Sequence, residues 1–231
     1  MTRPRFALLV ALLVVAASLP SAAQDAAAPP AVVALTPPQM DTFLHQAKIV
    51  RTRTAGNGVT NSKRVTLSDG VVTHDAHVQT IDESRLVFEA GKASELNFKD
   101  SYRYNIAGYR VAMLLGIQVP MSIDRTIDGQ HAAVTWWVDN VQMDEESRTK
   151  KKVKAPDALR FKRQIQVMRM FDELIQNRDR NQGNLLWTKD WDMWLIDHTR
   201  AFRLGTTLLN PKQLELCERA MYAKLPGGKC S

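Results

Sequence analysis

The sequence predicts an α+β fold built as two lobes. Short segments rich in β-branched residues fill much of the N-terminal half, and the tight-turn dipeptides Asp69-Gly70 and Asp128-Gly129 separate pairs of them. A single amphipathic helix interrupts this series of strands. The C-terminal half then opens with a second, longer helix. An antiparallel sheet with one helix, followed by a helix-led half, indicates an α+β chain with two lobes.

The first 23 residues have the pattern of a secretory signal peptide. Arg3 and Arg5 precede the apolar run "FALLVALLVVAA", and small residues end the segment at Ala23. We expect Sec-dependent export to the periplasm or the cell exterior, followed by a disordered Ala/Pro-rich leader over residues 24–40. The apolar run is short for a membrane span and lacks a stop-transfer flank, so no stable membrane anchor is expected after cleavage. A retained anchor is the alternative.

The mature chain has a modest basic excess and two cysteines. Removal of the signal peptide takes away two arginines and no acidic residue, so the formal net charge falls from +7 to +5. Much of the excess lies in "RTKKKVK" at 148–154 and is not interleaved with aromatic residues, which argues against a nucleic-acid partner. Because export leads to an oxidising compartment, a disulfide between Cys217 and Cys230 is favoured over a catalytic thiol.

The N-terminal lobe, predicted over residues 41–141, begins with three antiparallel strands. The segments "QAKIVRTR" (46–53) and "KRVTLS" (63–68) are rich in strand-forming residues and are separated by a glycine-containing loop. An Asp-Gly turn then leads into the third strand, "VVTHDAHVQTI" (71–81).

An amphipathic helix and a second hairpin complete this lobe. After a polar stretch, Asp100 is the expected N-cap of the helix and Gly116 its end. The apolar face follows spacings of four, three and four residues: Tyr102, Ile106, Tyr109 and Met113. Two strands, "IQVPMSIDRTI" (117–127) and "HAAVTWWV" (131–138), then flank the second Asp-Gly turn.

The second lobe is predicted over residues 156–231, after a charged connector over residues 142–155, and is short and mainly helical. Pro156 and Asp157 open its long helix. The broad apolar face of this helix consists of Phe161, Ile165, Met168, Phe171 and Ile175.

A polar loop and a short hairpin follow the long helix. The two strands of the hairpin are predicted at 184–188 ("NLLWT") and 192–197 ("DMWLID"), with a polar turn between them. A final helix is predicted at 211–225. The sequence contains no internal repeat.

Three polar residues in this region point to a cation site. Asp179, Asn184 and Asp197 lie within a run rich in Trp, Leu and Ile, and carboxylates and amides are costly to bury without partners. Mg²⁺ and similar cations prefer carboxylate and amide oxygens as ligands. The three residues can therefore share a cation such as Mg or Mn. The order of elements resembles that of protein kinases, in which this loop carries a catalytic Asp and, five residues later, a metal-binding Asn, and the next hairpin carries a metal-binding Asp. This resemblance implies that Asn184 and Asp197 hold the cation and that Asp179 positions an attacking hydroxyl. Residues of these types also favour turns by themselves, which is the structural alternative.

The catalytic segment of a known superfamily has a similar pattern. The segment "FDELIQNRDRNQGNLL…WLIDHTRAF" and the helix "DSYRYNIAGYRVAMLLGIQVP" resemble the phosphatidylinositol 3-/4-kinase-like group of atypical protein and lipid kinases. Within it the chain looks most like exported bacterial proteins of unknown function that share this core. The resemblance covers about residues 46–225. It implies a two-lobed protein-kinase-like fold and an ATP or other nucleotide bound with Mg or Mn between the lobes. It also implies transfer of phosphate to a hydroxyl of a protein, sugar or lipid.

The resemblance also implies positions for the nucleotide. Gly56 and Gly58 lie where a phosphate-covering loop belongs, and the backbone around Val138 is expected to receive the base. Gln79 stands where such kinases carry a strand Lys, and Asn105 where their helix carries a Glu.

This neutral pair leaves two functions open. Gln79 and Asn105 can hydrogen-bond phosphate oxygens but supply no positive charge, which weakens both ATP binding and transition-state stabilisation. Our hypothesis is that Lys63 or Arg64 substitutes from another direction. The first function is an exported atypical kinase. The second is a catalytically inactive pseudokinase that acts as an envelope binding or scaffold module.

Other candidate residues are assigned structural roles. His74 and His77 lie three residues apart on a strand, so they point to opposite faces and are not expected to share a metal ion. His198 is expected to support its loop by hydrogen bonding, with proton transfer as the alternative. The five tryptophans are expected in the core or between the lobes.

Overall fold

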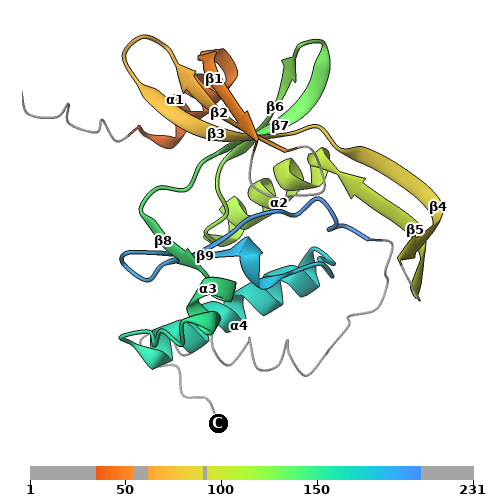
Figure 1. The fold of residues 1–231 in the computed structure, drawn as a ribbon, viewed down its shortest axis with the longest axis vertical. Helices are drawn as coiled ribbons and strands as arrows, with labels where there is room; N and C mark the ends of the chain where they lie inside the picture. The colour runs from red at the N-terminus through yellow and green to blue at the C-terminus, as the bar shows by residue number, and fades with distance from the viewer. Residues whose placement is uncertain (1–34, 55–61, 91–92, 204–231) are drawn as a thin grey trace, which may run out of the picture. The chain divides into compact units, whose positions relative to one another are not determined.

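The computed structural model describes residues 35–54, 62–90 and 93–203, which lie in one compact unit. The described part is α+β, as predicted (Figure 1). No helix in these ranges is long and apolar enough to cross a bilayer. Several predicted features fall outside them: the signal peptide, Gly56, Gly58, the helix at 211–225, Cys217 and Cys230.

A five-stranded antiparallel sheet forms the N-terminal lobe, in the order β1-β2-β3-β7-β6 (Figure 1). Its strands are β1 Lys48–Thr54, β2 Lys63–Ser68, β3 Thr73–Gln79, β6 Ser122–Ile127 and β7 Gln130–Trp136. The sequence predicts all five strands. At the second predicted turn, Asp128 and Gly129 have φ angles of 51° and 79°. Positive φ at both residues is the backbone of a type I′ turn, which explains the Asp-Gly dipeptide.

A helix that the sequence does not reveal covers one face of this sheet. α1 spans Pro37–Gln46, so residues 37–40 form its first turn and are not part of a disordered leader. Pro37 is favourable at the first helical position, where its missing N–H is not needed. Only Phe43 and Leu44 of α1 are buried, and two residues are too weak an apolar pattern to predict a helix. Both belong to the core between α1 and the sheet.

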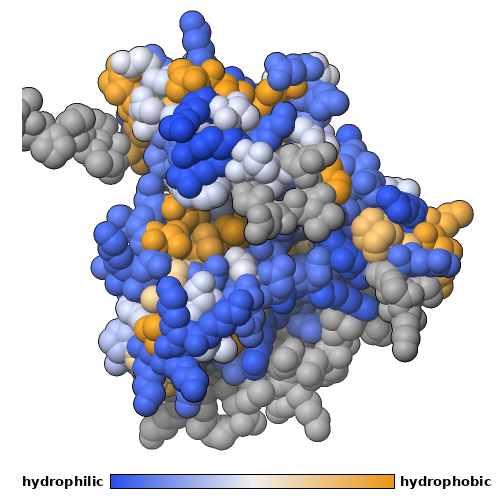
Figure 2. Space-filling model, viewed as in Figure 1, coloured by the Kyte–Doolittle hydropathy of each residue, from blue (hydrophilic) through white to orange (hydrophobic). Residues whose placement is uncertain are grey.

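An additional hairpin, formed by residues 82–101, lies where the sequence shows only a polar stretch. β4 (Asp82–Ala90) pairs with β5 (Ala93–Ser101), and together they form a separate two-stranded sheet. Leu86 and Leu96 are 82% and 72% exposed, and apolar side chains are visible on this hairpin in Figure 2. Because much of both strands is exposed, they lack the apolar alternation that marks a half-buried strand.

α2 spans Tyr102–Leu115 and packs against β6 and β7. Its N-cap is Ser101, not Asp100 as predicted, because Asp100 still belongs to β5. Gly116 ends the helix with a φ of 66°, as predicted. Met113 is 57% exposed and does not belong to the buried face. The buried face is instead formed by Tyr102, Asn105, Ile106, Gly108 and Ala112.

The second lobe is organised around the long helix α4, Ala158–Leu174. Asp157 caps it by accepting hydrogen bonds from two backbone N–H groups, each at 2.9 Å. The predicted apolar face is confirmed: Met168, Phe171 and Ile175 are buried, and Phe161 and Ile165 pack beside them. A 3₁₀ turn (Gln182–Asn184) then leads into the hairpin of β9 (Leu185–Thr188) and β10 (Met193–Leu195).

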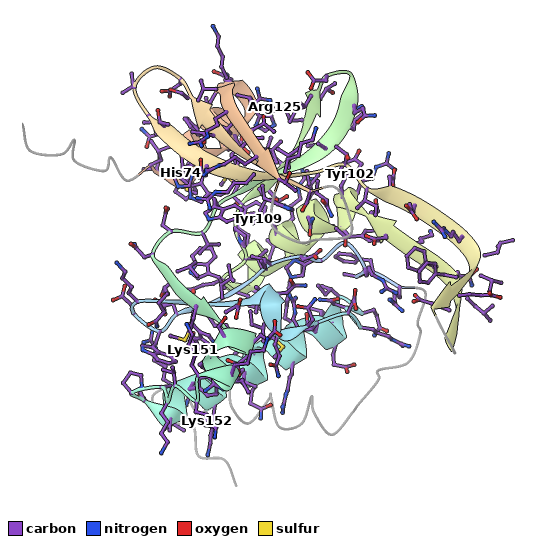
Figure 3. All side chains as sticks on the ribbon, viewed as in Figure 1. His74, Tyr102, Tyr109, Arg125, Lys151 and Lys152 are labelled. Atoms are coloured by element: carbon purple, nitrogen blue, oxygen red, sulfur yellow. The ribbon has the colours of Figure 1, made fainter. Side chains whose placement is uncertain are left out.

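The charged connector over residues 142–155 contains two elements that the sequence does not predict. β8 (Val141–Asp144) pairs with β9, and the short helix α3 (Glu145–Lys150) follows. Lys151 and Lys152 project from the end of this helix into solvent (Figure 3). The lysines of the connector therefore lie in solvent, at the end of α3 and in the turn after it. The strand β8 before α3 pairs with β9, which is distant in the sequence.

Candidate functional site

A cleft of about 760 Å³ lies between the five-stranded sheet and the β8–β10 sheet. Five of the predicted site residues line it. Gln79, Asn105 and Val138 come from the N-terminal lobe, and Asn184 and Asp197 come from the second lobe. Residues that are far apart in the sequence therefore face one volume, which is within the usual size range of ligand sites.

Asn184 and Asp197 are neighbours because of the β9–β10 hairpin. Leu185 and Leu195 are cross-strand partners, and the next backbone bond runs from the N–H of Ile196 to the carbonyl of Asn184, at 3.1 Å. Asp197 follows directly. Residues opposite each other on paired strands carry their side chains a few ångströms apart, so the hairpin explains why both side chains line one cleft.

The backbone of Asp197 adopts the left-handed conformation, with a φ of 55°. Asp is one of the few non-glycine residues that enter this region readily. Its Oδ1 accepts hydrogen bonds from the Thr199 hydroxyl, at 3.1 Å, and from the Thr199 N–H, at 3.4 Å. These bonds hold one carboxylate oxygen and leave Oδ2 for a ligand in the cleft.

A buried ion pair fixes the loop that carries the site. Arg180 pairs with Asp172 of α4 at 2.9 Å, and both side chains are about nine-tenths buried. The same guanidinium donates to the carbonyl of Ile196 at 2.5 Å and to that of Asn184 at 3.3 Å. Arg180 therefore ties the end of α4 to both strands that position the candidate cation ligands.

His198 is an almost fully buried residue in the wall of the cleft. Its side chain is 1% exposed, and its backbone N–H donates to Oδ1 of Asn105 at 2.7 Å. A Cβ on Gly108 of α2 would lie 3.1 Å from the imidazole ring, so any larger residue there would press on the ring. Burial, with the nearby Arg180, lowers the pKa of His198 well below its usual range. This burial favours a supporting role for His198, but the hydrogen bond that supports the loop comes from its backbone N–H, and its ring Nε2 has no partner among the described residues.

We expect the free energy of unfolding to fall as the pH is lowered from 7 to 5. Burial lowers the pKa of both His198 and His77 in the folded state, although Asp197 partly opposes this at His77. In the unfolded chain both imidazoles take up a proton near pH ~6.5. The stability that they contribute is therefore present above that pH and is lost below it.

Urea unfolding at pH 7, 6 and 5 measures this loss. His198→Gln, which cannot be protonated, should reduce the slope of stability against pH. An identical slope in the variant would contradict the prediction.

The cleft has an apolar end and a polar end. Trp136, Trp137, Val138 and Val141 form apolar walls where the two lobes join, and Figure 2 shows apolar surface recessed between the lobes. A planar base would find its contacts there. The polar end is formed by Gln79, Asn105, Asn184 and Asp197.

No Lys or Arg among the described residues lines this cleft. Lys63 shares a face of β2 with buried Val65 and Leu67 of the core, so its exposed side chain lies on the side away from the cleft. Arg64 lies on the cleft side, opposite His77. Its guanidinium stacks over Trp137 at 4.0 Å and pairs with Asp75 at 2.6 Å. The hypothesis that Lys63 replaces the missing positive charge at Gln79 is therefore not supported. Arg64 is held by Trp137 and Asp75 and does not line the cleft.

Asp179 does not line the cleft. Its side chain is 52% exposed and pairs with Arg200 at 3.2 Å. Arg200 also pairs with Glu95 of the β4–β5 hairpin at 2.5 Å, and Arg203 pairs with the same carboxylate at 2.6 Å. Sequence reasoning missed this cluster, because the hairpin that supplies Glu95 was not recognisable.

The two strand histidines have separate surroundings, as predicted from their spacing. His74 stacks on Trp136 with ring centroids 3.6 Å apart and contacts Asp139 at 3.0 Å. His77 lies on the other face of β3 and lines the cleft. His77 is half-buried there, and burial lowers its pKa.

The donor set in the cleft suits a hard divalent cation that also binds phosphate. Among the described residues, no group of three or more His, Cys, Asp or Glu side chains could hold a metal ion on its own. Asn184 and Asp197 supply one amide and one carboxylate. Mg²⁺ is commonly held by one or two carboxylates together with water and substrate phosphates. The residues present therefore fit a cation that arrives with a phosphorylated ligand.

Solved structures similar to this chain were found, and one of them is a kinase. No family model matches the chain, and no curated protein matches it. A crystal structure of the Helicobacter pylori proinflammatory kinase CtkA is similar over 68% of this chain, with 13% sequence identity and a TM-score of 0.49. The aligned part spans 60% of the length of that protein.

Proposed function

We propose that the protein is an atypical kinase-like protein that binds a nucleotide together with Mg or Mn between its lobes. The observation that carries the proposal is the convergence of Gln79, Asn105, Val138, Asn184 and Asp197 on one cleft. The resemblance of the sequence to kinase-like proteins assigns these positions, and the fold brings them to a common volume.

In this proposal the two ends of the cleft would bind different parts of the nucleotide. The base would lie against the tryptophans and Val138, and the phosphates would extend toward the polar end. There the cation would be held by Asn184 and Asp197, and it would neutralise phosphate charge. Asp179 would act outside the lining, where it could orient the hydroxyl of a protein, sugar or lipid acceptor once its carboxylate leaves Arg200.

Because the cleft is lined by acidic side chains, the proposal requires that the nucleotide binds together with a metal ion. Among the described residues, the lining contains the carboxylates of Asp144, Glu146 and Asp197 and no lysine or arginine. A free triphosphate would therefore meet a negative surface, whereas its metal complex would carry less charge.

A second candidate function is a pseudokinase that serves as a binding or scaffold module. Two observations favour it. Oδ1 of Asn105 accepts a hydrogen bond from the backbone N–H of His198, so this oxygen holds the loop in place and is engaged rather than available to a cation. Asp179 is held in an ion pair with Arg200.

A thermal-shift experiment on the mature protein tests the nucleotide proposal. We expect ATP with Mg or Mn to raise the melting temperature by roughly 5–10 °C at a hundredfold excess over Kd, whereas ATP without metal has little effect. Asp197→Asn should remove most of the shift, because it deletes the carboxylate charge and keeps a residue that tolerates positive φ. Asp190→Asn, an exposed change in the turn of the same hairpin, is the matched control.

The outcomes separate the two functions. A metal-dependent shift that survives in Asp190→Asn and is lost in Asp197→Asn supports the cation site. A shift equal in all three proteins would show that nucleotide binds elsewhere. No shift with any nucleotide and metal would overturn the proposal and favour the scaffold function.

We also propose that the protein acts outside the cytoplasm. The proposal rests on the signal-peptide pattern of residues 1–23. Cell fractionation with N-terminal sequencing tests it, and an intact N-terminus in the cytoplasmic fraction would contradict it.

A further inference from the structure

Asp100, near the end of β5, is a buried carboxylate to which the proposed cation site gives no role. The residue is 7% exposed, and its Oδ1 has no hydrogen-bond partner. No other carboxylate among the described residues has a buried oxygen without a partner. Burying a charged group without a partner costs free energy. In native proteins, groups of this kind often serve catalysis or hold an ion or a water molecule.

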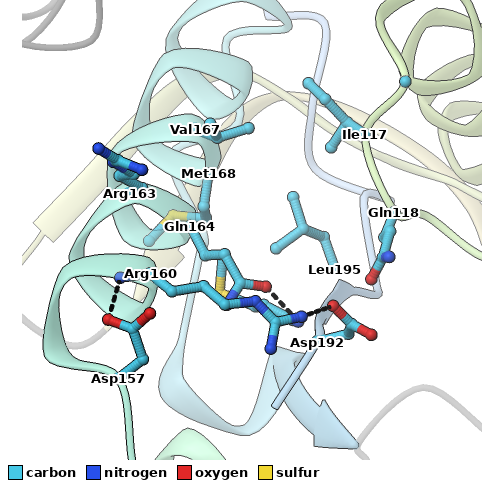
Figure 4. Close-up of a pocket in the computed structure, with 12 residues that line it drawn as sticks. Ile117, Gln118, Asp157, Arg160, Arg163, Gln164, Val167, Met168, Asp192 and Leu195 are labelled. Carbon is cyan, nitrogen blue, oxygen red and sulfur yellow. Dashed lines mark hydrogen bonds and ion pairs between the residues drawn. The ribbon is translucent and has the colours of Figure 1, made fainter. Parts of the chain in front are cut away.

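The hollow along α4 shows the more usual arrangement of acidic groups. This groove of about 430 Å³ lies between α4 and β10, and its lining includes Asp157 and Asp192. Asp157 accepts a hydrogen bond from the N–H of Arg160 at 2.9 Å, and Asp192 pairs with the guanidinium of the same residue (Figure 4). Both carboxylates therefore have partners within the protein, whereas Oδ1 of Asp100 has none.

The loop after β10 is fastened to the end of β5 and brings Asp197 toward Asp100. The N–H of Ser101 donates to the carbonyl of Thr199 at 2.8 Å. The N–H of His198 donates to a side-chain oxygen of α2 at 2.7 Å. The two residues that follow Asp197 are therefore both bonded to the junction of β5 and α2, which carries Asp100.

One hydroxyl lies beside both carboxylates. The hydroxyl of Thr199 donates to Oδ1 of Asp197 at 3.1 Å. Burial raises the pKa of Asp100; the neighbouring Thr199 hydroxyl opposes this shift, Asp197 adds to it, and Arg200 opposes it. Because a hydroxyl has a single proton, it can donate to only one of the two carboxylates at a time. The other carboxylate then needs a different positive partner.

Arg200 lies near enough to influence Asp100, but its charge is already divided. Its guanidinium pairs with Glu95 and with Asp179. Its Nε has no hydrogen-bond partner among the described residues, so it does not donate to Asp100. The structural alternative is that Asp100 serves only to hold Arg200 in place by its charge.

We propose that Asp100 is a further ligand of the cation site and binds Mg or Mn together with Asp197. The inference rests on the proposed function, which assigns this cation to Asn184 and Asp197. Hard divalent cations prefer carboxylate oxygens, and the number of charged ligands tunes their affinity. The cation would also compensate the negative charge that Thr199 and Arg200 leave without a full partner.

Binding of Mn²⁺ alone to the mature protein, measured by electron paramagnetic resonance, tests the inference. Asp100→Asn should weaken Mn²⁺ binding by about tenfold. Because it removes a buried charge without a full partner, the metal-free variant should melt at the wild-type temperature or above it. Asp82→Asn is the matched control. Asp82 lies opposite Ser101 on the same hairpin, is 44% exposed and accepts a hydrogen bond from Ser101 at 2.7 Å, so this variant should bind Mn²⁺ as the wild type does.

A second variant separates ligation from packing. Asp100→Glu changes the packing more than Asp100→Asn but keeps the carboxylate, so it should bind Mn²⁺ more tightly than Asp100→Asn does. The reverse order would overturn the inference. A lower melting temperature of Asp100→Asn with unchanged Mn²⁺ binding would show that Asp100 only holds Arg200, and would also overturn it.

The failure of this inference is distinguishable from the failure of the proposed function. Mn²⁺ binding that is lost in Asp197→Asn and kept in Asp100→Asn would leave the cation site in place without Asp100. Wild-type protein that binds no Mn²⁺ would overturn the inference about Asp100. The thermal shift with nucleotide and metal then decides the proposed function by itself.

Discussion

Arg180→Ala is expected to lower the free energy of unfolding by about 3–5 kcal/mol, the usual cost of removing one partner from a buried ion pair. The Arg180 side chain is 8% exposed and that of Asp172 10%. Without the guanidinium, Asp172 keeps only the amide of Asn177, at 3.0 Å, as a described partner. The carbonyls of Ile196 and Asn184 lose a charged donor as well. Urea or thermal unfolding measures the loss.

Arg178→Ala is the matched control, because Arg178 is exposed and makes one hydrogen bond, at 3.3 Å, to Gln176. Surface changes of this kind usually alter stability by less than about 0.5 kcal/mol. A double variant with Asp172→Asn should lose less than the sum of the two single losses, since each change removes the same pair. Equal effects of Arg180→Ala and Arg178→Ala would show that the ion pair does not stabilise the loop.

The elements that the sequence predicts are those whose signals are local. The strands around the two Asp-Gly turns and the apolar face of α4 follow from residues within one turn or one helix. The missed elements depend on distant partners. β8 pairs with β9 more than forty residues later, and the β4–β5 hairpin has little buried surface to leave a pattern.

The candidate site likewise has features that local sequence predicts and features that depend on distant residues. The spacing of Asn184 and Asp197 across a short predicted hairpin is enough to place them together. Alternate residues of a strand point to opposite faces of the sheet. In β2 the side chain of Lys63 therefore points to the core face, and that of the next residue, Arg64, to the cleft face. A shift of one residue in the predicted strand would exchange the two. The contact between Arg200 and Glu95 depends on a hairpin that the sequence does not reveal, so no local pattern could predict that Arg200, the partner of Asp179, is also bound there.

The second large effect is expected at Trp187, in the middle of β9. Its side chain is 0% exposed and stacks on Phe161 with ring centroids 4.9 Å apart. Its indole N–H donates to Glu145 at 2.8 Å. Burial alone would raise the pKa of Glu145, but hydrogen bonds from Arg148 and Trp187 outweigh it and the net pKa is lowered. Trp187 therefore joins the core of the second lobe to the charged start of α3.

Trp187→Ala should cost about 3–5 kcal/mol, the range for deleting a large buried aromatic side chain. Trp187→Phe keeps an aromatic ring but removes the donor to Glu145, so we expect a smaller loss of about 1–3 kcal/mol. Chemical unfolding of the two variants separates packing from hydrogen bonding. Equal losses would mean that the hydrogen bond to Glu145 dominates and packing against Phe161 contributes little. Because β9 begins directly after Asn184, the larger cavity should also weaken any metal-dependent nucleotide shift, whereas Trp187→Phe should preserve it.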